Sequence, residues 1–155
     1  MAEAAPSAPR VVLDTSVLVR GILSRRGPSG YILDSFLDGA FDLVLSLSII
    51  AEVESVLRRR HIRARPSFNT EDSHDLLVAL IEASHIASGT YDIKLVPTDA
   101  KDNHIISTAL EGGAGMLVTE DARDLLSLKV IKIRGFPPVQ VVDAKAFARQ
   151  LRQRL

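Results

Sequence analysis

Short apolar runs alternate with stretches of helical periodicity along this chain, and this alternation narrows the folds open to it more than any other feature. The runs predict strands at Val11–Leu13, Phe41–Leu45, Ile93–Val96, Met116–Val118 and Val130–Ile133. Strands that are largely apolar throughout are typical of a parallel sheet with both faces covered. We therefore expect an α/β fold: a three-layer α/β/α sandwich with right-handed crossovers and a mostly parallel central sheet of about five strands.

Between these runs, apolar residues recur at the spacing of a helix, and capping residues mark several helix ends. The predicted helices are Ser16–Leu23, Tyr31–Leu37, Ile49–Arg60 with Ser48 as N-cap, a longer helix from a cap at Asn69 or Thr70 to near Gly89, Asp102–Leu110, and Ala144–Leu151 with Asp143 as N-cap. Gly112 and Gly113 are expected to stop the fifth helix. The longest loop is expected at His61–Asn69.

The 155 residues are enough for one ordinary domain. Residues Met1–Pro9 are rich in Ala and Pro and contain no apolar segment of the kind found in a secretory signal. We expect a disordered tail over 1–9, followed by a single domain over 10–155. No apolar run approaches the roughly 20 residues that span a bilayer. The expected location is therefore the cytoplasm, without membrane association.

Composition excludes several classes of site. Cysteine is absent, so the chain has no disulfide, no thiolate metal site and no thiol nucleophile, and any metal must be held by oxygen or imidazole. Lys plus Arg equals Asp plus Glu, at 19 each, whereas proteins that coat nucleic acid by overall charge are strongly basic. Contact with nucleic acid would then depend on local patches. No glycine-rich nucleotide-binding motif is present.

One dense basic segment stands out against this neutral balance. Its arginines are Arg58, Arg59, Arg60, Arg63 and Arg65. Such a segment is typical of a solvated helix end, where positive charge complements the helix dipole. It also suits contact with an RNA backbone, or the docking of an acidic segment of a protein partner. The sequence leaves all three interpretations open.

Acidic residues follow the predicted strands one after another. Asp14 follows the first strand, Asp99 and Asp102 the third, and Glu120, Asp121 and Asp124 the fourth, while Glu52 lies in the helix after the second. Ligands of open parallel sheets bind beyond the carboxyl ends of the strands, so these acids are expected to converge there. Clustered carboxylates repel one another unless a cation compensates, and oxygen ligands suit Mg²⁺ or Mn²⁺. Each acid alone also fits a helix cap or a solvated position, and only the set predicts a metal site.

Four stretches resemble, in the same order, the motifs of PIN-domain nucleases. They are Val11–Val19 with Asp14-Thr15-Ser16, Ser48–Val53 with Glu52, Asp102–Ala109, and Leu117–Asp121 with Thr119-Glu120-Asp121. The resemblance spans about Val11–Phe147 and is strongest to toxins of bacterial toxin–antitoxin pairs of the VapC type. It implies a PIN-like fold and a metal-dependent endoribonuclease that cleaves single-stranded or structured RNA. It also implies an antitoxin partner and a homodimer, for which Tyr31–Leu37 or Leu76–Ile81 would offer an apolar face.

The resemblance also implies residue roles. Asp14, Glu52, Asp102 and Asp121 would form the catalytic set and coordinate Mg²⁺ or Mn²⁺. Ser16 and Thr119 would supply hydroxyls that orient these carboxylates or a metal-bound water, and Asp99 and Asp124 would support them. Ser16 stands where the family usually has Asn, and Asp124 lies one residue beyond the family's usual second Asp. We favour Asp121 over Asp124 as the fourth ligand.

Other enzyme and non-enzyme classes fit less well. Phosphatases of the haloacid dehalogenase type require a second Asp two residues after the first, where this chain has Ser16. A receiver domain requires an acidic pair before the end of the first strand, together with a late Lys. The remaining alternative is an inactive PIN-fold binding or scaffold module. An inactive copy of the nuclease would be expected to have lost one of the acids. A ribonuclease assay with and without EDTA separates an active nuclease from an inactive binding module.

Overall fold

A computed structural model of the protein describes residues 8–88 and 100–154, and of residues 100–102 it describes the backbone alone. Within this part of the chain, six strands form one sheet in the order β3-β2-β1-β4-β6-β5. The strands are β1 (Arg10–Leu13), β2 (Asp42–Ser46), β3 (His85–Ala87), β4 (Met116–Val118), β5 (Val130–Ile131) and β6 (Val139–Val142). All neighbouring strands are parallel except β5 and β6. The predicted mostly parallel sheet is confirmed.

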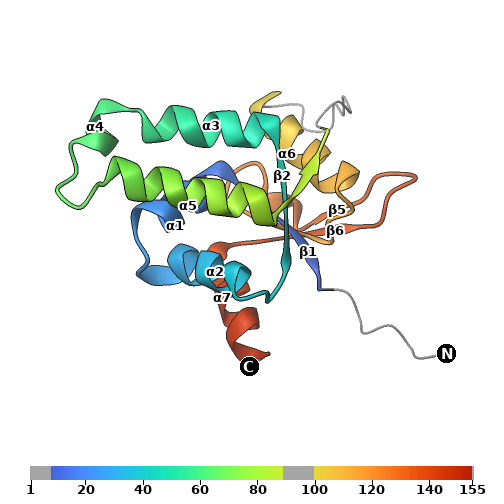
Figure 1. Cartoon of the computed structure of the whole chain (residues 1–155). Coiled ribbons are helices and arrows are strands. Elements are labelled where there is room, and N and C mark those ends of the chain that lie inside the picture. Colours follow the sequence, from blue (N-terminus) through green and yellow to red (C-terminus); the bar gives the residue numbers. More distant parts are fainter. Residues whose placement is uncertain (1–7, 89–99, 155) are drawn as a thin grey trace.

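The helices lie on both faces of this sheet. They are α1 (Thr15–Leu23), α2 (Gly27–Leu37), α3 (Leu47–Leu57), α4 (Arg60–Arg63), α5 (Thr70–Ala83), α6 (Ala100–Glu111) and α7 (Ala144–Gln153), with a short 3₁₀ turn at Leu126–Leu128. Figure 1 shows the sheet nearly edge-on, with α1, α2 and α5 on one side and α6 on the other. Helix α2 packs against both α1 and α7, while α6 packs on β1, β2 and β4. The expected three-layer α/β/α sandwich is therefore confirmed.

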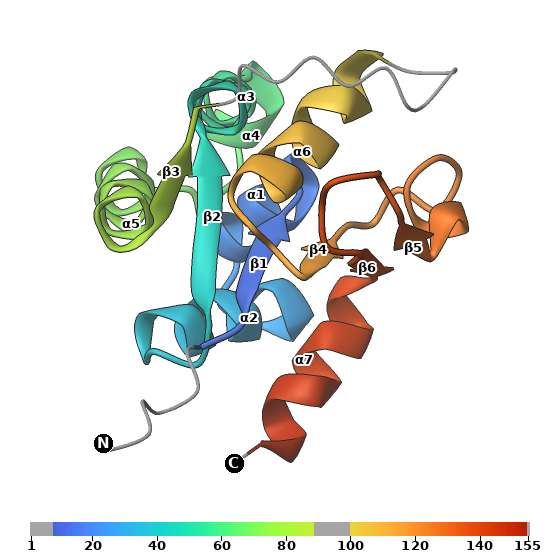
Figure 2. The ribbon, with the colours of Figure 1, turned by 90° about the vertical axis from the view of Figure 1, so that its right-hand side faces the viewer.

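Strand β1 lies at the centre of the core. Val11, Val12 and Leu13 are almost completely buried, as are Leu43 and Leu45 of the neighbouring β2. Burial on both faces explains why these strands are apolar throughout rather than alternating. In Figure 2 the arrows of β1 and β2 point toward the end of the sheet where α1 and α3 begin. Residues that follow these strands are thus collected at one end of the molecule.

The strand order reverses beside β1. The chain passes from β1 to β2 and on to β3 at one edge, and then returns through α6 to β4 on the other side of β1. Asp14 N donates to Val118 O at 2.9 Å, so the chain segments leaving β1 and β4 lie in contact. A reversal of this kind opens a crevice beyond the carboxyl ends of the two strands, which is where open α/β sheets bind ligands.

Two strands were not predicted from the sequence. The helix predicted to run to near Gly89 ends at Ala83, and His85–Ala87 forms β3, which pairs with β2. That prediction was wrong because no Gly or Pro lies between Thr70 and Gly89 to mark the helix end, and pairing with a distant strand overrides the local pattern. Strand β6 pairs with β4 and places β5 at the sheet edge in antiparallel orientation. The predicted strand Ile93–Val96 lies outside the described residues.

Three local predictions also need correction. The N-cap of α3 is Ser46, whose Oγ accepts from Ile49 N at 3.3 Å, whereas the predicted cap, Ser48, is an exposed residue of the first turn. The predicted loop at His61–Asn69 begins inside α4. Pro9, assigned to the tail, accepts a hydrogen bond from Asp42 N through its carbonyl oxygen. Residues 1–7 of that tail lie outside the description.

Among the described residues, none of the helices combines the length and the apolar character that crossing a bilayer requires.

Candidate active site

Asp14 lies at the crevice between β1 and β4. It is the N-cap of α1, and its Oδ1 accepts from Thr15 N at 2.7 Å. Its Oδ2 accepts from the hydroxyl of Thr119, which follows β4 and is completely buried, at 2.7 Å. The same Thr119 hydroxyl accepts from Asp121 N at 3.0 Å. The carboxylate is therefore fixed from both strands, and Asp14 serves as a helix cap as well as a site residue.

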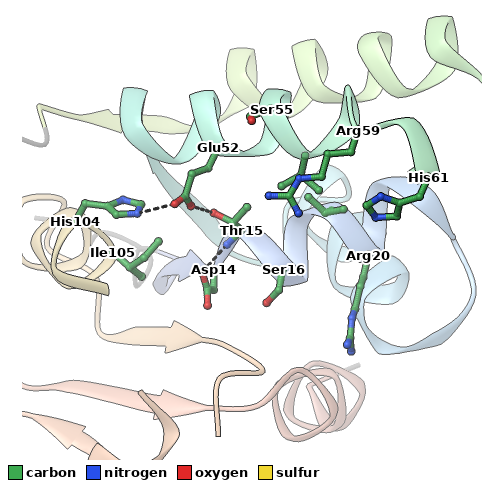
Figure 3. Close-up of a pocket in the computed structure, with 12 residues that line it drawn as sticks. Asp14, Thr15, Ser16, Arg20, Glu52, Ser55, Arg59, His61, His104 and Ile105 are labelled. Carbon is green, nitrogen blue, oxygen red and sulfur yellow. Dashed lines mark hydrogen bonds and ion pairs between the residues drawn. The ribbon is translucent and has the colours of Figure 1, made fainter. Parts of the chain in front are cut away.

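Glu52 approaches Asp14 from α3. Its Oε2 accepts from the hydroxyl of Thr15, the residue after Asp14, at 2.5 Å. Its Oε1 lies 3.3 Å from His104 Nε2 of α6, and the other ring nitrogen of His104 is buried without a hydrogen-bond partner in the described part of the chain. Figure 3 shows Asp14, Thr15, Glu52 and His104 gathered at one end of a pocket. Three elements distant in sequence thus contribute to one polar group.

The electrostatics of the group centre on Asp14. Burial raises the pKa of Asp14 above its usual range, and the negative charges of Glu52 and Asp121 raise it further. The hydrogen bonds from Thr119 and Thr15 favour the ionised form and lower the pKa in part. The net rise means that the negative charge on Asp14 is poorly compensated by the protein. Such a carboxylate is a favourable partner for a cation.

The described side chains of the site have the right donor type for a hard divalent cation, but fewer ligands than such an ion needs. Asp14, Glu52 and Asp121 offer oxygen alone, the donor type that Mg²⁺ and Mn²⁺ prefer. Among the side chains that the structure describes, no three Asp, Glu or His residues lie close enough together to hold an ion unaided. A further ligand is needed, and Asp102 lies in the first turn of α6, two residues before His104. The side chain of Asp102 and the whole of Asp99 lie outside the described residues.

The acids that follow β4 have different surroundings. Asp121 Oδ1 accepts from the backbone N–H groups of Arg123 and Asp124, each at 3.2 Å, so it caps the turn as well as acting on Asp14. Asp124 is half-buried and is not among the groups that shift Asp14. Glu120 Oε1 accepts from Ala144 N at 3.1 Å and so helps to cap α7. Asp121 is therefore the acid of this segment that interacts with Asp14.

The pocket beside Asp14 measures about 650 Å³. Its lining includes Asp14, Ser16 and Glu52 together with Arg20, Arg59 and His61. Figure 3 shows the carboxylates and His104 at one end and the three basic residues at the other. Ser16 is exposed to the pocket. The pocket thus joins a negative end to a positive end, an arrangement suited to a phosphate-bearing ligand with a cation.

The predicted basic segment does not act as one surface. Arg59 lines the site pocket, whereas Arg58 and Arg63 line a different pocket between α3 and α5. Arg60 is exposed at the start of α4. Arg65 lines two further pockets. Only part of the predicted contact set therefore lies near the acids.

Sequence reasoning gave no role to Thr15, Arg20 or His61. A signal was present in the helical spacing. Arg20 follows Ser16 by four residues, so the two lie on one face of α1. Arg59 lies beyond the end of α3, so helical spacing from Glu52 does not place it. The contact between Glu52 and His104 has no comparable signal, since 52 residues separate them.

Comparison with known proteins agrees with this geometry. The family model described as PIN domain matches residues 10–123. Among solved structures, a chain in the crystal structure of VapBC2 from Rickettsia felis bound to a promoter DNA fragment superimposes with a TM-score of 0.54 at 14% identity. The match covers 86% of this chain and 98% of that one. A search of curated proteins found no match. With a family match over well more than half of its length, this chain belongs to the PIN domain family.

Proposed function

We propose that this protein is a metal-dependent endoribonuclease whose active site is the crevice between β1 and β4. The observation that supports this most directly is the buried Asp14, which has a raised pKa and lies beside Glu52 and Asp121 at the reversal of strand order. A carboxylate with a raised pKa in a pocket is a candidate functional group. The proposed ligands of Mg²⁺ or Mn²⁺ are Asp14, Glu52, Asp102 and Asp121.

The protein's own residues prepare the site for a phosphodiester. The Thr119 hydroxyl donates to one carboxylate oxygen of Asp14, and Thr15 N donates to the other. The Thr15 hydroxyl donates to the carboxylate of Glu52. Carboxylates fixed in advance need little rearrangement when the substrate enters. A bound divalent cation would supply charge neutralisation and a more acidic water. Arg59, at the far end of the pocket, offers positive charge to a phosphate that the carboxylates alone would repel.

Cleavage of a labelled single-stranded RNA tests the proposal. The purified protein should cut the RNA with Mg²⁺ or Mn²⁺, stop when EDTA is added, and resume when metal is restored. Asp14→Asn should abolish cleavage, because it removes the charge while keeping the shape. Asp75→Asn, at an exposed position of α5, is the matched control and should cut normally. Cleavage that survives EDTA or Asp14→Asn would contradict the proposal, and an inactive binding module would bind RNA without cutting it.

We further propose that the ribonuclease is the toxin of a toxin–antitoxin pair and acts on RNA in the cytoplasm. The fold likeness to a chain of the VapBC2 structure supports this assignment. Induced synthesis in a bacterial host should arrest growth, and the Asp14→Asn variant should not. Co-expression with the product of a small adjacent gene should restore growth if that product is the antitoxin. Normal growth with active enzyme present would contradict the toxin assignment but leave the ribonuclease proposal in place.

A further inference from the structure

The arginines at and beyond the end of α3 lie on two different pockets. Arg59 is the N-cap of α4, with an extended backbone, and lines the site pocket. Arg58, its neighbour, lies 4.0 Å from Glu54 and lines the pocket between α3 and α5, as does Arg63. Arg58 has a helical backbone at the end of α3 and Arg59 an extended one, so these sequence neighbours lie on different pockets. Arg59 is the one of these three arginines that lines the pocket holding the acids.

The site pocket adjoins a second pocket. Val19 and Arg20 of α1 line both the site pocket and a neighbouring pocket of about 350 Å³. The lining of the second pocket also includes Arg26 and Arg65. Because the two pockets share Val19 and Arg20 they adjoin, and their basic lining extends from Arg59 and Arg20 near the acids to Arg26 and Arg65. We call this the arginine groove.

The charges of the arginine groove are available to a ligand. Arg20, Arg26, Arg59 and Arg65 are exposed, and none has a carboxylate within 4.0 Å in the described ranges 8–88 and 103–154. Arg25, by contrast, forms an ion pair with Asp34. Glu120 is the acid that lines the second pocket, and its Oε1 accepts from Ala144 N at the start of α7. The groove is therefore positive along its length beyond the acids.

A row of guanidinium groups matches a row of phosphates. Arginine binds phosphate oxygens through paired N–H groups, and successive arginines suit a ligand with successive negative charges. The two pockets have the size of small-molecule sites, which suits part of a single strand. An acidic peptide would meet the same arginines but would be repelled by the uncompensated acids at Asp14. RNA, whose phosphate can share a cation with those acids, fits both ends.

We propose that the arginine groove binds the backbone of an extended single strand of RNA on one side of the scissile phosphate. The assignment rests on the proposed ribonuclease function. Arg59 and Arg20 contact the phosphates nearest the acids, while Arg26 and Arg65 contact phosphates further along the strand. The substrate is consequently a polynucleotide held over several residues, and a dinucleotide receives only part of the binding free energy.

The test compares two double variants that remove equal charge. Arg26→Ala/Arg65→Ala alters the distal groove, and Arg58→Ala/Arg63→Ala alters the separate pocket between α3 and α5. Binding of a long single-stranded RNA is measured by fluorescence anisotropy over a range of salt concentrations, in EDTA, which stops cleavage under the proposed function. Each lost phosphate contact lowers the slope of log K against log salt by about 0.7. The groove variant should therefore lose about 1.4 in slope, and the other variant should match the wild type.

The outcomes separate the groove from the catalytic proposal. Equal losses in both double variants, or none in either, would overturn the groove assignment. So would an oligoglutamate peptide that binds with the same arginine dependence while RNA does not. In cleavage assays, the groove variant should lose the rate advantage of long RNA but keep wild-type cleavage of a dinucleotide. A protein that binds long RNA through the groove and cuts no RNA would contradict the ribonuclease proposal and leave the groove in place.

Discussion

At the scale of single residues, Asp14 is both a helix cap and the least compensated charge described in the site. Because its pKa is higher in the folded chain than in the unfolded chain, ionisation of Asp14 lowers the free energy of unfolding. This loss is present above the raised pKa and disappears as the pH falls toward the usual pKa of an aspartate. Without metal, Asp14→Asn should therefore be more stable than wild type at neutral pH.

The difference in stability should narrow as the solution is acidified through the raised pKa. Urea unfolding at neutral and at mildly acidic pH, in EDTA, measures it. The Asp75→Asn variant, at an exposed position, controls for the substitution itself and should follow the wild type. A variant at Asp14 that is less stable than wild type at neutral pH would show that the lost hydrogen bonds outweigh the relieved repulsion.

Asp121 and Asp124 offer a second comparison between single residues. Asp121 acts on the pKa of Asp14, and Asp124 does not. Asp121→Asn should therefore lower the cleavage rate on the order of a hundredfold, as the loss of one fixed charge-stabilising group does elsewhere. Asp124→Asn should lose much less. Rates measured side by side under the same metal concentration decide between them, and a greater loss at Asp124 would reverse the assignment.

At the scale of elements, the start of α3 determines where Glu52 lies. Ser46 is completely buried, caps α3 through Ile49 N and accepts from the Thr108 hydroxyl at 3.0 Å. Ser46→Ala should lower the free energy of unfolding by about 1–2 kcal/mol. Ser48→Ala, at the exposed position that the sequence favoured, should change it by less than about 0.5 kcal/mol. Urea unfolding of both variants checks this, and equal effects would restore Ser48 as the cap.

Helices α1 and α2 pack closely against each other at Gly21. A Cβ on Gly21 would lie 2.6 Å from Leu33 Cδ1 and 2.8 Å from the backbone oxygen of Ser29. The backbone atom cannot move away easily, so Gly21→Ala should destabilise the fold by about 1–3 kcal/mol. Gly115→Ala is the control, since nothing lies within 4 Å of a Cβ there. Thermal unfolding compares the two, and a neutral Gly21→Ala would show that the helices separate readily.

At the scale of the whole molecule, the expected homodimer has little free apolar surface at its predicted locations. Ile32, Leu33 and Phe36 of α2 are buried within the chain, and Leu37 and Val78 are the large apolar side chains exposed there. A homodimer stays a prediction, and it would have to use these two residues with polar neighbours. Light scattering should give twice the 16.9 kDa of one chain. A single-chain mass at micromolar concentration would contradict it.

The sequence by itself determined the features that local pattern records. The apolar runs of β1 and β2 and the helical periodicities predict alternation of strands and helices, and the position of Asp14 after a buried strand predicts an acid at the sheet's carboxyl end. The motif order identified the family that the comparison then showed. These features follow from sequence because strand and helix period, capping and turn chemistry depend on residues only a few positions apart.

Only the tertiary structure decided which distant residues meet. His85–Ala87 is too short to be recognised as a strand, and it becomes one because β2 offers a free edge. Thr119 reaches Asp14 across 105 positions, and Glu52 meets His104 across 52. The division of the basic segment between two surfaces likewise depends on how α3 packs between its neighbours. Such contacts follow from the paths of the connections and from burial, and local periodicity contains no information about either.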